Sequence, residues 1–496
     1  MKKSNKTIKW INNKIKRVKT SNPQMLKYYI GIIWSVAGTI VSKMFVMLAG
    51  IITARILGAD KNGIYGMIYS TVIMIASFVS LGLGITVMKF ISEYKIHEKE
   101  KCGRIIGLTY IVATVLGGII TIALIMNSKI ISQELLYNEE LENYLNIASI
   151  LLIINIMNTI QTNCLIGFER FKVIAQVTGI QGIISFPILI ILTHYYDVYG
   201  MLVAQIIIGL FGTCVLMIVN NKARKQYDIK IDFVCSYKEK SLFIKFALPA
   251  IMANGLVGPI TWFGNSLFVS IPDGYTQLGI FNAANLWRTM ITFIPTAIGN
   301  VMIPMIISEK NNSKVEKLNV LLGLIIVIAF SIPLLVFPEL LSYLYGRDYQ
   351  GRDFTVALVL VVLVSIIWSY GDGISRKMIS NNLMWWGLLS NSIWGIAYIS
   401  FVILFKELGA SGLALALLFA YIISIVVFVP INIYRRVVHK SLYISKELFI
   451  MWVTLFVLAL FPLIGSPITI RIIFAFIAYL VLFRVFKLMV NNHPLN

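Results

Sequence analysis

The chain has 496 residues, of which 58% are hydrophobic and only 13% are charged. Soluble domains carry roughly 25% charged residues, and a soluble core could not hide this much apolar surface. The apolar residues also come in blocks of about 20, the length at which a helix crosses a bilayer. The composition therefore excludes a soluble globular protein and predicts an all-α, polytopic membrane protein.

The formal net charge of +21 does not indicate a nucleic-acid partner, because the basic residues are spread over short loops and form no separate basic domain. Residues 1–28 are polar and basic without a leading apolar run, so we expect a cytoplasmic segment and not a signal peptide. A surface helix on anionic membrane lipids and a disordered tail are both compatible with this segment. The four cysteines lack metal-ligand spacing, so we expect neither disulfides nor a metal site.

Apolar length, Gly and Pro punctuation and charged flanks divide the chain into about fourteen spans. Six spans in 29–220 make an N-lobe, and residues 221–240 form a cytoplasmic linker. Six more in 241–434 make a C-lobe, and a final pair with the tail occupies 435–496. The expected spans are 29–57, 62–92, 104–126, 143–166, 172–194, 199–220, 241–271, 276–307, 317–338, 354–376, 383–405, 411–434, 446–464 and 468–488.

The positive-inside rule tests this count, because one missed span would exchange the sides of all later loops. With the N-terminus inside, the cytoplasmic segments hold 33 of the 43 Lys and Arg residues, and the outer segments hold seven. Both termini are therefore expected in the cytoplasm. The longest outer loops, near 127–142 and 339–353, have only some fifteen residues, so we expect no catalytic platform there and no enzyme.

An internal repeat emerges when the first pair of spans is aligned with the seventh and eighth at an offset of 216 residues. Each copy consists of a helix, an outer turn that contains glycine, an aromatic residue at the start of the next helix and an acidic residue at the inner end of that helix. Copies separated by six spans run in the same direction, which predicts parallel repeats about a central cleft; chance matching of glycines is the alternative. The aligned pairs are Gly58 with Gly274, Gly63 with Gly279, Tyr65 with Phe281, and Ser92-Glu93 with Ser308-Glu309.

Five motifs follow one another between residues 55 and 304, and the resemblance that they carry covers nearly the whole chain. They are Arg55-Ile-Leu-Gly-Ala-Asp-Lys-Asn-Gly-Ile-Tyr65, Leu81-Gly-Leu-Gly-Ile-Thr-Val-Met-Lys-Phe-Ile-Ser-Glu93, Gly167-Phe-Glu-Arg-Phe171, Leu278-Gly-Ile-Phe-Asn-Ala-Ala284 and Ile303-Pro304. In this order the motifs resemble those of bacterial polysaccharide flippases, which belong to the multidrug, oligosaccharidyl-lipid and polysaccharide exporter superfamily. Each motif alone is loose, and the specificity comes from their order, the spans and the duplication.

The resemblance implies two six-helix lobes around a central cavity, plus a C-terminal helix pair, in the bacterial plasma (inner) membrane. It implies that the protein flips a lipid-linked oligosaccharide or polysaccharide repeat unit, of the polyprenyl-pyrophosphate type, to the outer leaflet for O-antigen, capsule or another envelope polymer. The implied partners are the lipid-linked glycan, membrane lipids and other polysaccharide assembly proteins. No cofactor is implied, and a coupling ion, H+ or Na+, stays open.

Two cations stand well inside the predicted spans. Lys43 lies near the middle of the first span, where an unpaired cation costs about 2.5 to 3.5 kcal/mol on insertion scales. Arg288 lies about four residues outward of the middle of span eight, on a face that it shares with Asn282, Asn285 and several threonines. A pyrophosphate needs cationic donors that replace its hydration. We therefore expect Lys43 and Arg288 to hold one anion across the cleft, and structural helix contacts are the alternative.

The remaining candidates have strong structural alternatives. Lys89, at the inner end of span two, could bind substrate, pair with Glu93 or extend to the interface. Arg55 stands at the outer end of span one beside Asp60. Amides in spans four and seven could bind sugar hydroxyls, although interhelical hydrogen bonds are their more common role. These amides are Asn155, Asn158, Asn254 and Asn265.

Two other functions compete with flipping. A multidrug antiporter of the same superfamily would carry organic cations, which the mid-span cations repel, and it would need a mid-span carboxylate. Asp372, the main acidic candidate, lies beside Arg376 and Lys377, so we expect it in a salt bridge at the interface. A membrane polysaccharide polymerase or ligase would need a large outer loop with catalytic groups.

Overall fold

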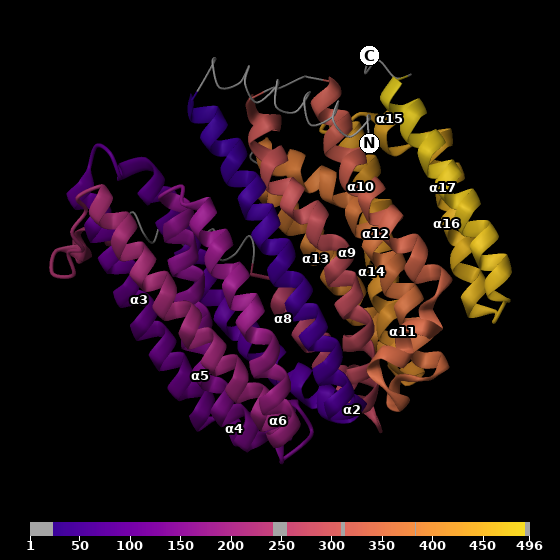
Figure 1. Ribbon diagram of the computed structural model, residues 1–496, viewed down its shortest axis with the longest axis horizontal. Helices are drawn as coiled ribbons and strands as arrows, with labels where there is room; N and C mark the ends of the chain where they lie inside the picture. Colours follow the sequence, from indigo (N-terminus) through magenta and orange to yellow (C-terminus); the bar gives the residue numbers. More distant parts are fainter. Residues whose placement is uncertain (1–22, 242–254, 309–312, 382, 492–496) are drawn as a thin grey trace, which may run out of the picture.

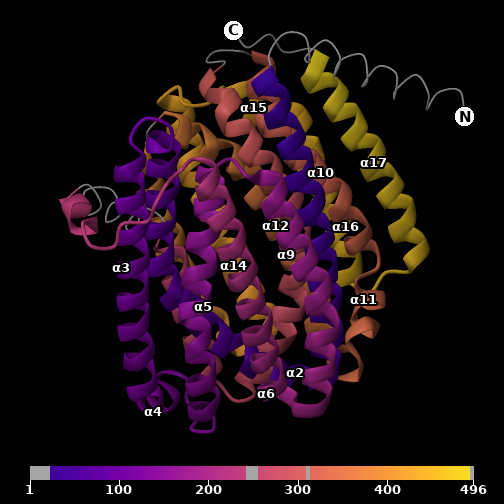
Figure 2. The same ribbon diagram turned by 60° about the vertical axis from the view of Figure 1, so that its left-hand side comes forward.

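A computed structural model describes residues 23–241, 255–308, 313–381 and 383–491. These residues are helical nearly throughout, and the described part of the chain contains no β-strand. Figures 1 and 2 show long helices side by side in a bundle, with the first and second halves of the chain on different sides. The all-α prediction is confirmed. The surface helix considered within residues 1–28 falls almost entirely outside the described residues.

Two very long helices dominate the first half of the chain, and each is broken near its middle. α2 (Pro23–Tyr94) breaks at Gly58, whose φ of 75° and ψ of 176° suit a residue without a β-carbon. α6 (Phe171–Gln226) breaks at Tyr196 and Asp197, and Asp197 pairs with Lys61 just beyond the break in α2, at 2.7 Å. We call this part the N-half. Its other elements are α3 (Lys99–Met126), α4 (Ser128–Ile130), the π-helix η1 (Ile131–Leu135) and α5 (Leu141–Gly167).

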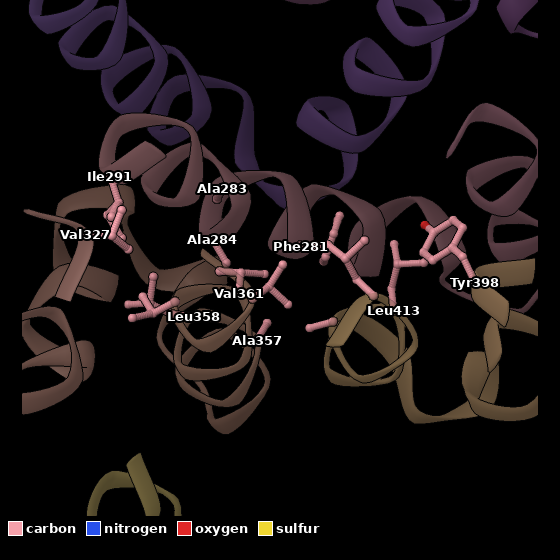
Figure 3. Close-up of a cluster of buried hydrophobic side chains, with 14 of the residues drawn as sticks. Phe281, Ala283, Ala284, Ile291, Val327, Ala357, Leu358, Val361, Tyr398 and Leu413 are labelled. Carbon is pink, nitrogen blue, oxygen red and sulfur yellow. The ribbon is translucent and has the colours of Figure 1, made fainter. Parts of the chain in front are cut away.

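The second half of the chain, here called the C-half, is built around α9 (Gly274–Ser308) and α12 (Arg352–Ser380). Figure 3 shows α9 placing Ala284 and Ile291 against buried residues of neighbouring helices, among them Val327 and Val361. This face of α9 belongs to the C-half core and leaves its other faces for different contacts. The remaining helices are α8 (Val257–Val269), α10 (Ser313–Val336), α11 (Pro338–Tyr345), η3 (Arg347–Tyr349), α13 (Met384–Phe405), η4 (Lys406–Leu408) and α14 (Gly409–Tyr434).

The described residues hold nine segments that are long and apolar enough to cross a membrane. Three of them, 42–94, 171–226 and 385–434, have 50 residues or more, which is over twice the length of one crossing. Each of these three contains a break or a short turn, so each supplies more than one crossing. A polytopic membrane protein is therefore confirmed, while the number fourteen stays a prediction because residues 242–254 are not described.

The bundle has two distinguishable sides. Figure 1 shows the start of α2 and the end of α17 (Ile468–Asn491) at the same end, which we call the termini side. The short helices α4 and α11 lie toward the other end, which we call the opposite side. Because helices alternate in direction, the breaks in α2 and α6 also fall on the opposite side.

The predicted linker is attached to the N-half. α6 continues to Gln226, beyond the predicted span end at 220, and the chain then crosses α3. A β-carbon on Gly103 of α3 would lie 1.9 Å from the carbonyl oxygen of Lys230, so only a glycine lets the linker approach this closely. Arg104 then binds Glu239 of η2 (Ser236–Glu239) at 2.9 Å. The linker thus moves with α3.

The C-terminal helices are α16 (Lys446–Leu463) and α17, preceded by the short α15 (Lys440–Tyr443), and a buried cation is among the groups that hold them to the C-half. Arg471 is 3% exposed. Its guanidinium donates to both carboxylate oxygens of Glu339 at 2.8 and 2.7 Å, and to the carbonyl oxygens of Ser466 and Val336. Through Nε and Nη1 the guanidinium thus joins the turn between α16 and α17 to α10 and α11.

We predict that Arg471→Ala lowers the free energy of unfolding by about 2 kcal/mol, because it removes a buried guanidinium and its charge-assisted bonds to Glu339. Thermal melting of the purified protein in detergent measures this loss. Arg484→Ala is the matched control, since Arg484 lies on the same helix with an exposed side chain. An equal loss in both variants would contradict the proposed clamp.

Candidate functional site

The two copies of the repeat meet face to face on the opposite side. A β-carbon on Gly63 of α2 would lie 1.8 Å from the carbonyl oxygen of Tyr275 in α9, and one on Gly279 would lie 1.8 Å from that of Ala59. Tyr275 follows Ala59 by the same 216 residues that separate Gly279 from Gly63, so the contact is reciprocal. Small residues allow this close approach of two backbones. Asn62 adds a hydrogen bond to the Gly279 carbonyl oxygen at 3.2 Å.

Each half also sends a loop across to the other on this side. The end of η1 in the N-half supplies carbonyl oxygens to hydroxyls of α8 and α9. The turn η3 in the C-half supplies a tyrosine hydroxyl to carbonyl oxygens of α2. These loops lie beside the glycine contact and close the opposite side further. The donor and acceptor pairs are Ser266 with Leu135, Tyr275 with Leu136, and Tyr349 with both Ala54 and Gly58.

The contact between the halves continues inward from the glycine crossing. A β-carbon on Gly66 would lie 2.2 Å from Nδ2 of Asn282, and one on Gly50 would lie 3.1 Å from Cδ2 of Leu286. The Trp262 indole N–H of α8 also donates to the Thr71 hydroxyl of α2 at 2.8 Å. The described interface between the halves thus extends from the opposite side at least as far as Thr71 of α2 and Leu286 of α9.

Nearer the termini side, the same helices touch partners within their own half. A β-carbon on Gly84 of α2 would lie 2.7 Å from Nδ2 of Asn163 in α5. One on Gly299 of α9 would lie 2.9 Å from Nη1 of Arg376 in α12. The change of partner along α2 and α9 marks the depth at which the halves part.

Arg288 lies in the middle of α9 and is half-buried. Its Nε donates to Oδ1 of Asn285 at 2.6 Å, and its guanidinium lies within electrostatic reach of the hydroxyls of Tyr398 and Tyr421. Leu286 faces α2. Arg288 comes two residues later, and a step of two residues rotates the side-chain direction by about 200° around the helix axis. Arg288 therefore points toward α13 and α14 within the C-half, which the sequence does not reveal because Tyr398 and Tyr421 lie far along the chain.

Lys43 of α2 is half-buried and has no hydrogen-bond or ion-pair partner among the described residues. It stands seven residues before Gly50, which is two helical turns, so it shares the face that Gly50 presents to α9. The neighbouring Phe45 packs on Phe186 of α6 with ring centroids 5.9 Å apart. Lys43 thus faces the region between the halves, about 10 Å from Gly50 toward the termini side.

The structure does not bring Lys43 and Arg288 into contact, because Arg288 turns into the C-half. Their joint grip on one anion stays a prediction. Arg288 borders a polar stripe on α9, which includes the half-buried Asn282 and Asn285 and the exposed Thr289. The Thr289 hydroxyl donates to the carbonyl oxygen of Asn285 on the same helix.

Lys89 and Arg55 lie at the ends of the two arms of α2, away from this middle region. Lys89 is exposed near the termini side, with Nζ 5.4 Å from the centroid of the Phe90 ring. Arg55 is exposed on the opposite side, where its Cγ would lie 3.4 Å from a β-carbon on Gly346 of the C-half. Arg55 thus borders the closed contact.

The candidate amides differ in what remains free for a ligand. Asn158 donates to the carbonyl oxygen of Gly209 in α6 at 3.1 Å, which is an interhelical bond. Asn155 donates to its own helix, at Leu151. Asn265 is 8% exposed and its Oδ1 has no described partner. Asn254 lies outside the described residues.

Two ion pairs involve polar residues from the acidic candidate Asp372 and from the motif 167–171. Asp372 pairs with Arg376, which is 5% exposed and also donates to Oδ1 of Asn319 at 2.6 Å. The expected salt bridge of Asp372 is therefore confirmed. In the motif 167–171, Glu169 binds the buried Lys95 at 2.6 Å, so this motif ties α2 to α5. The Asp372 pair lies within α12, and the bond from Arg376 to Asn319 joins α12 to α10.

Comparisons with known proteins place this geometry in a family. The family of polysaccharide biosynthesis proteins matches residues 30–309, which is more than half of the chain. The EPS I polysaccharide export inner membrane protein EpsE of Ralstonia solanacearum is 20% identical over 426 residues, or 80% of this chain and 92% of that protein. An uncharacterized membrane protein of Methanocaldococcus jannaschii is 22% identical over 73% of this chain and 88% of its own length.

Solved structures show the same fold at low identity. The lipid II flippase MurJ in an inward closed conformation has a TM-score of 0.69 and 15% identity, over 92% of this chain and 99% of that one. An inward-facing multidrug exporter of the MATE family has a TM-score of 0.67 and 14% identity, over 82% and 96%. The chain therefore belongs to the polysaccharide biosynthesis protein family, and it shares the fold of these solved structures.

Proposed function

We propose that this protein flips a lipid-linked oligosaccharide or polysaccharide repeat unit, carried on a polyprenyl pyrophosphate, from the inner to the outer leaflet by alternating access. The observation that carries the proposal is the reciprocal crossing at Gly63 and Gly279, which closes one side of the bundle while polar groups stand at mid-depth. The related EpsE is a polysaccharide export protein, and the structurally similar MurJ is a lipid II flippase. Transport, and not catalysis, is the activity of such proteins.

In this proposal the termini side faces the cytoplasm, as the distribution of Lys and Arg predicts. The opposite side, closed by the glycine crossing and the two loops, is then the outer side. The headgroup enters from the termini side, where α2 and α9 contact their own halves. Export requires that the crossing separate, which breaks the bonds of Tyr275 and Tyr349 to the other half.

Arg288 is the residue best placed to hold the pyrophosphate. Its guanidinium presents planar donors that suit a phosphate, and Asn285 orients it through the 2.6 Å bond to Nε. Lys43 faces the region between the halves from α2 and adds a mobile point charge on the path of the headgroup. An anionic headgroup gains most from such cations in a membrane, where few other groups replace its hydration.

A disulfide between Gly66→Cys and Asn282→Cys should lock the outer side shut. The two positions lie on different halves, and a β-carbon on Gly66 would nearly touch the Asn282 side chain. In a variant whose four native cysteines are replaced, oxidation should abolish translocation of a labelled polyprenyl-linked glycan in proteoliposomes. Reduction should restore it.

Gly84→Cys with Asn163→Cys is the matched control for this cross-link. It also joins a glycine to an asparagine at close range, yet both positions lie within the N-half. Its disulfide should leave translocation nearly unchanged. Full translocation by the oxidised 66–282 pair would contradict alternating access through this crossing.

Arg288→Gln should reduce glycan translocation at least tenfold, because a neutral side chain forfeits the charge-assisted bonds to pyrophosphate, worth about 1.5–3 kcal/mol. Lys43→Ala should cause a smaller loss, and Lys43→Arg should retain part of the activity. Translocation is measured in proteoliposomes after membrane insertion has been verified. Normal activity in both Arg288→Gln and Lys43→Ala would remove the anion-binding role from the proposal.

A further inference from the structure

A cavity of about 370 Å³ lies within the C-half, between α8, α12, α13 and α14. Its volume falls in the range of roughly 300–1,000 Å³ typical of small-ligand pockets. None of the site residues predicted from the sequence lines it. Aromatic rings and polar side chains share its wall, among them Trp368, Trp394, Tyr421, Asp372, Ser390 and Asn391.

Several polar side chains of this cavity have unused hydrogen-bonding capacity. Ser390, Asn391 and Ser424 make no hydrogen bond with any described residue. On the same helix α13, Ser392 and Ser400 bond their own backbone at Leu388 and Ile396, as helical serines commonly do. The hydroxyls and the amide in the cavity are thus free to bind a ligand.

The charges around the cavity disfavour a cationic ligand. Its carboxylate, Asp372, is already paired with Arg376. A second guanidinium, that of Arg435, lies 4.4 Å from the ring of Trp386, which adjoins the cavity residue Gly387. The aromatic rings with free hydroxyl and amide groups suit a neutral polyol, whose apolar face stacks on a ring while its hydroxyls bind polar groups.

The cavity also adjoins the proposed anion site. Tyr421 lines the cavity, and Arg288 on the neighbouring helix α9 lies within electrostatic reach of its hydroxyl. A ligand that holds a phosphate at Arg288 therefore has its next chemical unit within reach of the cavity. In a lipid-linked glycan that unit is a sugar.

We propose that this cavity is a saccharide subsite, which takes a neutral pyranose ring of the headgroup while the attached pyrophosphate meets Arg288. The subsite rests on the proposed flippase function and adds a substrate determinant to it. Stacking on the half-buried Trp368 and hydrogen bonds to Asn391, Ser390 and Ser424 select the sugar.

Binding to the full-length protein in lipid nanodiscs tests the subsite. The probes are farnesyl pyrophosphate without sugar, and the same lipid bearing glucosyl, galactosyl or N-acetylglucosaminyl units. The variant Asn391→Ala with Ser424→Ala removes two groups that make no hydrogen bond with the described residues, so the fold should not suffer. Ser392→Ala, one residue from Asn391, is the matched control because its hydroxyl bonds only its own helix.

The wild type should bind at least one glycosylated probe about tenfold more tightly than the sugar-free lipid, and the double variant should lose this preference while Ser392→Ala keeps it. A preference retained by the double variant would overturn the subsite and leave the flippase function standing. Equal binding of all four lipids by the wild type would also overturn the subsite. Failure to bind any of them would overturn the proposed function itself. Preferential binding of tetraphenylphosphonium, weakened by the double variant, would assign the cavity to organic cations instead.

Discussion

The backbone contact between Gly63 and Gly279 sets the arrangement of the two halves. Because a β-carbon at either position would lie 1.8 Å from a carbonyl oxygen of the other helix, no other residue permits the same spacing. The separation of α2 and α9 in turn determines where Tyr349 reaches α2 and where Tyr275 reaches η1. A duplicated sequence uses its two copies here as the two faces of one contact.

The sequence predicts much of the fold for physical reasons. Apolar length and the distribution of basic residues anticipate the helices, and the 216-residue offset brings together Ala59 with Tyr275 and Gly63 with Gly279, which meet in space. A helix in lipid must satisfy its own backbone, so apolar length alone is a strong signal. Boundaries are less predictable, because α6 continues to Gln226, where charged residues extend the helix beyond the bilayer.

The site is less predictable than the fold. Charge in a span identifies Lys43 and Arg288 as unusual, yet the direction of Arg288 depends on Tyr398 and Tyr421, more than 100 residues away. Asn158 and Asn391 look alike in sequence. Asn158 donates a hydrogen bond to the Gly209 carbonyl oxygen, whereas Asn391 has no partner in the described part of the chain. Only the packing of the helices shows which of these amides joins two helices.

The hydrogen bonds of Arg471 to Glu339 attach α16 and α17 to the C-half, so the pair should move with it. The two halves are similar in design, but α16 and α17 are attached to the C-half and make it broader than the N-half. A fluorophore or fusion partner near the described end of α17 will report the rotation of the C-half alone. The same asymmetry gives an assembly partner a surface by which to distinguish two otherwise similar halves.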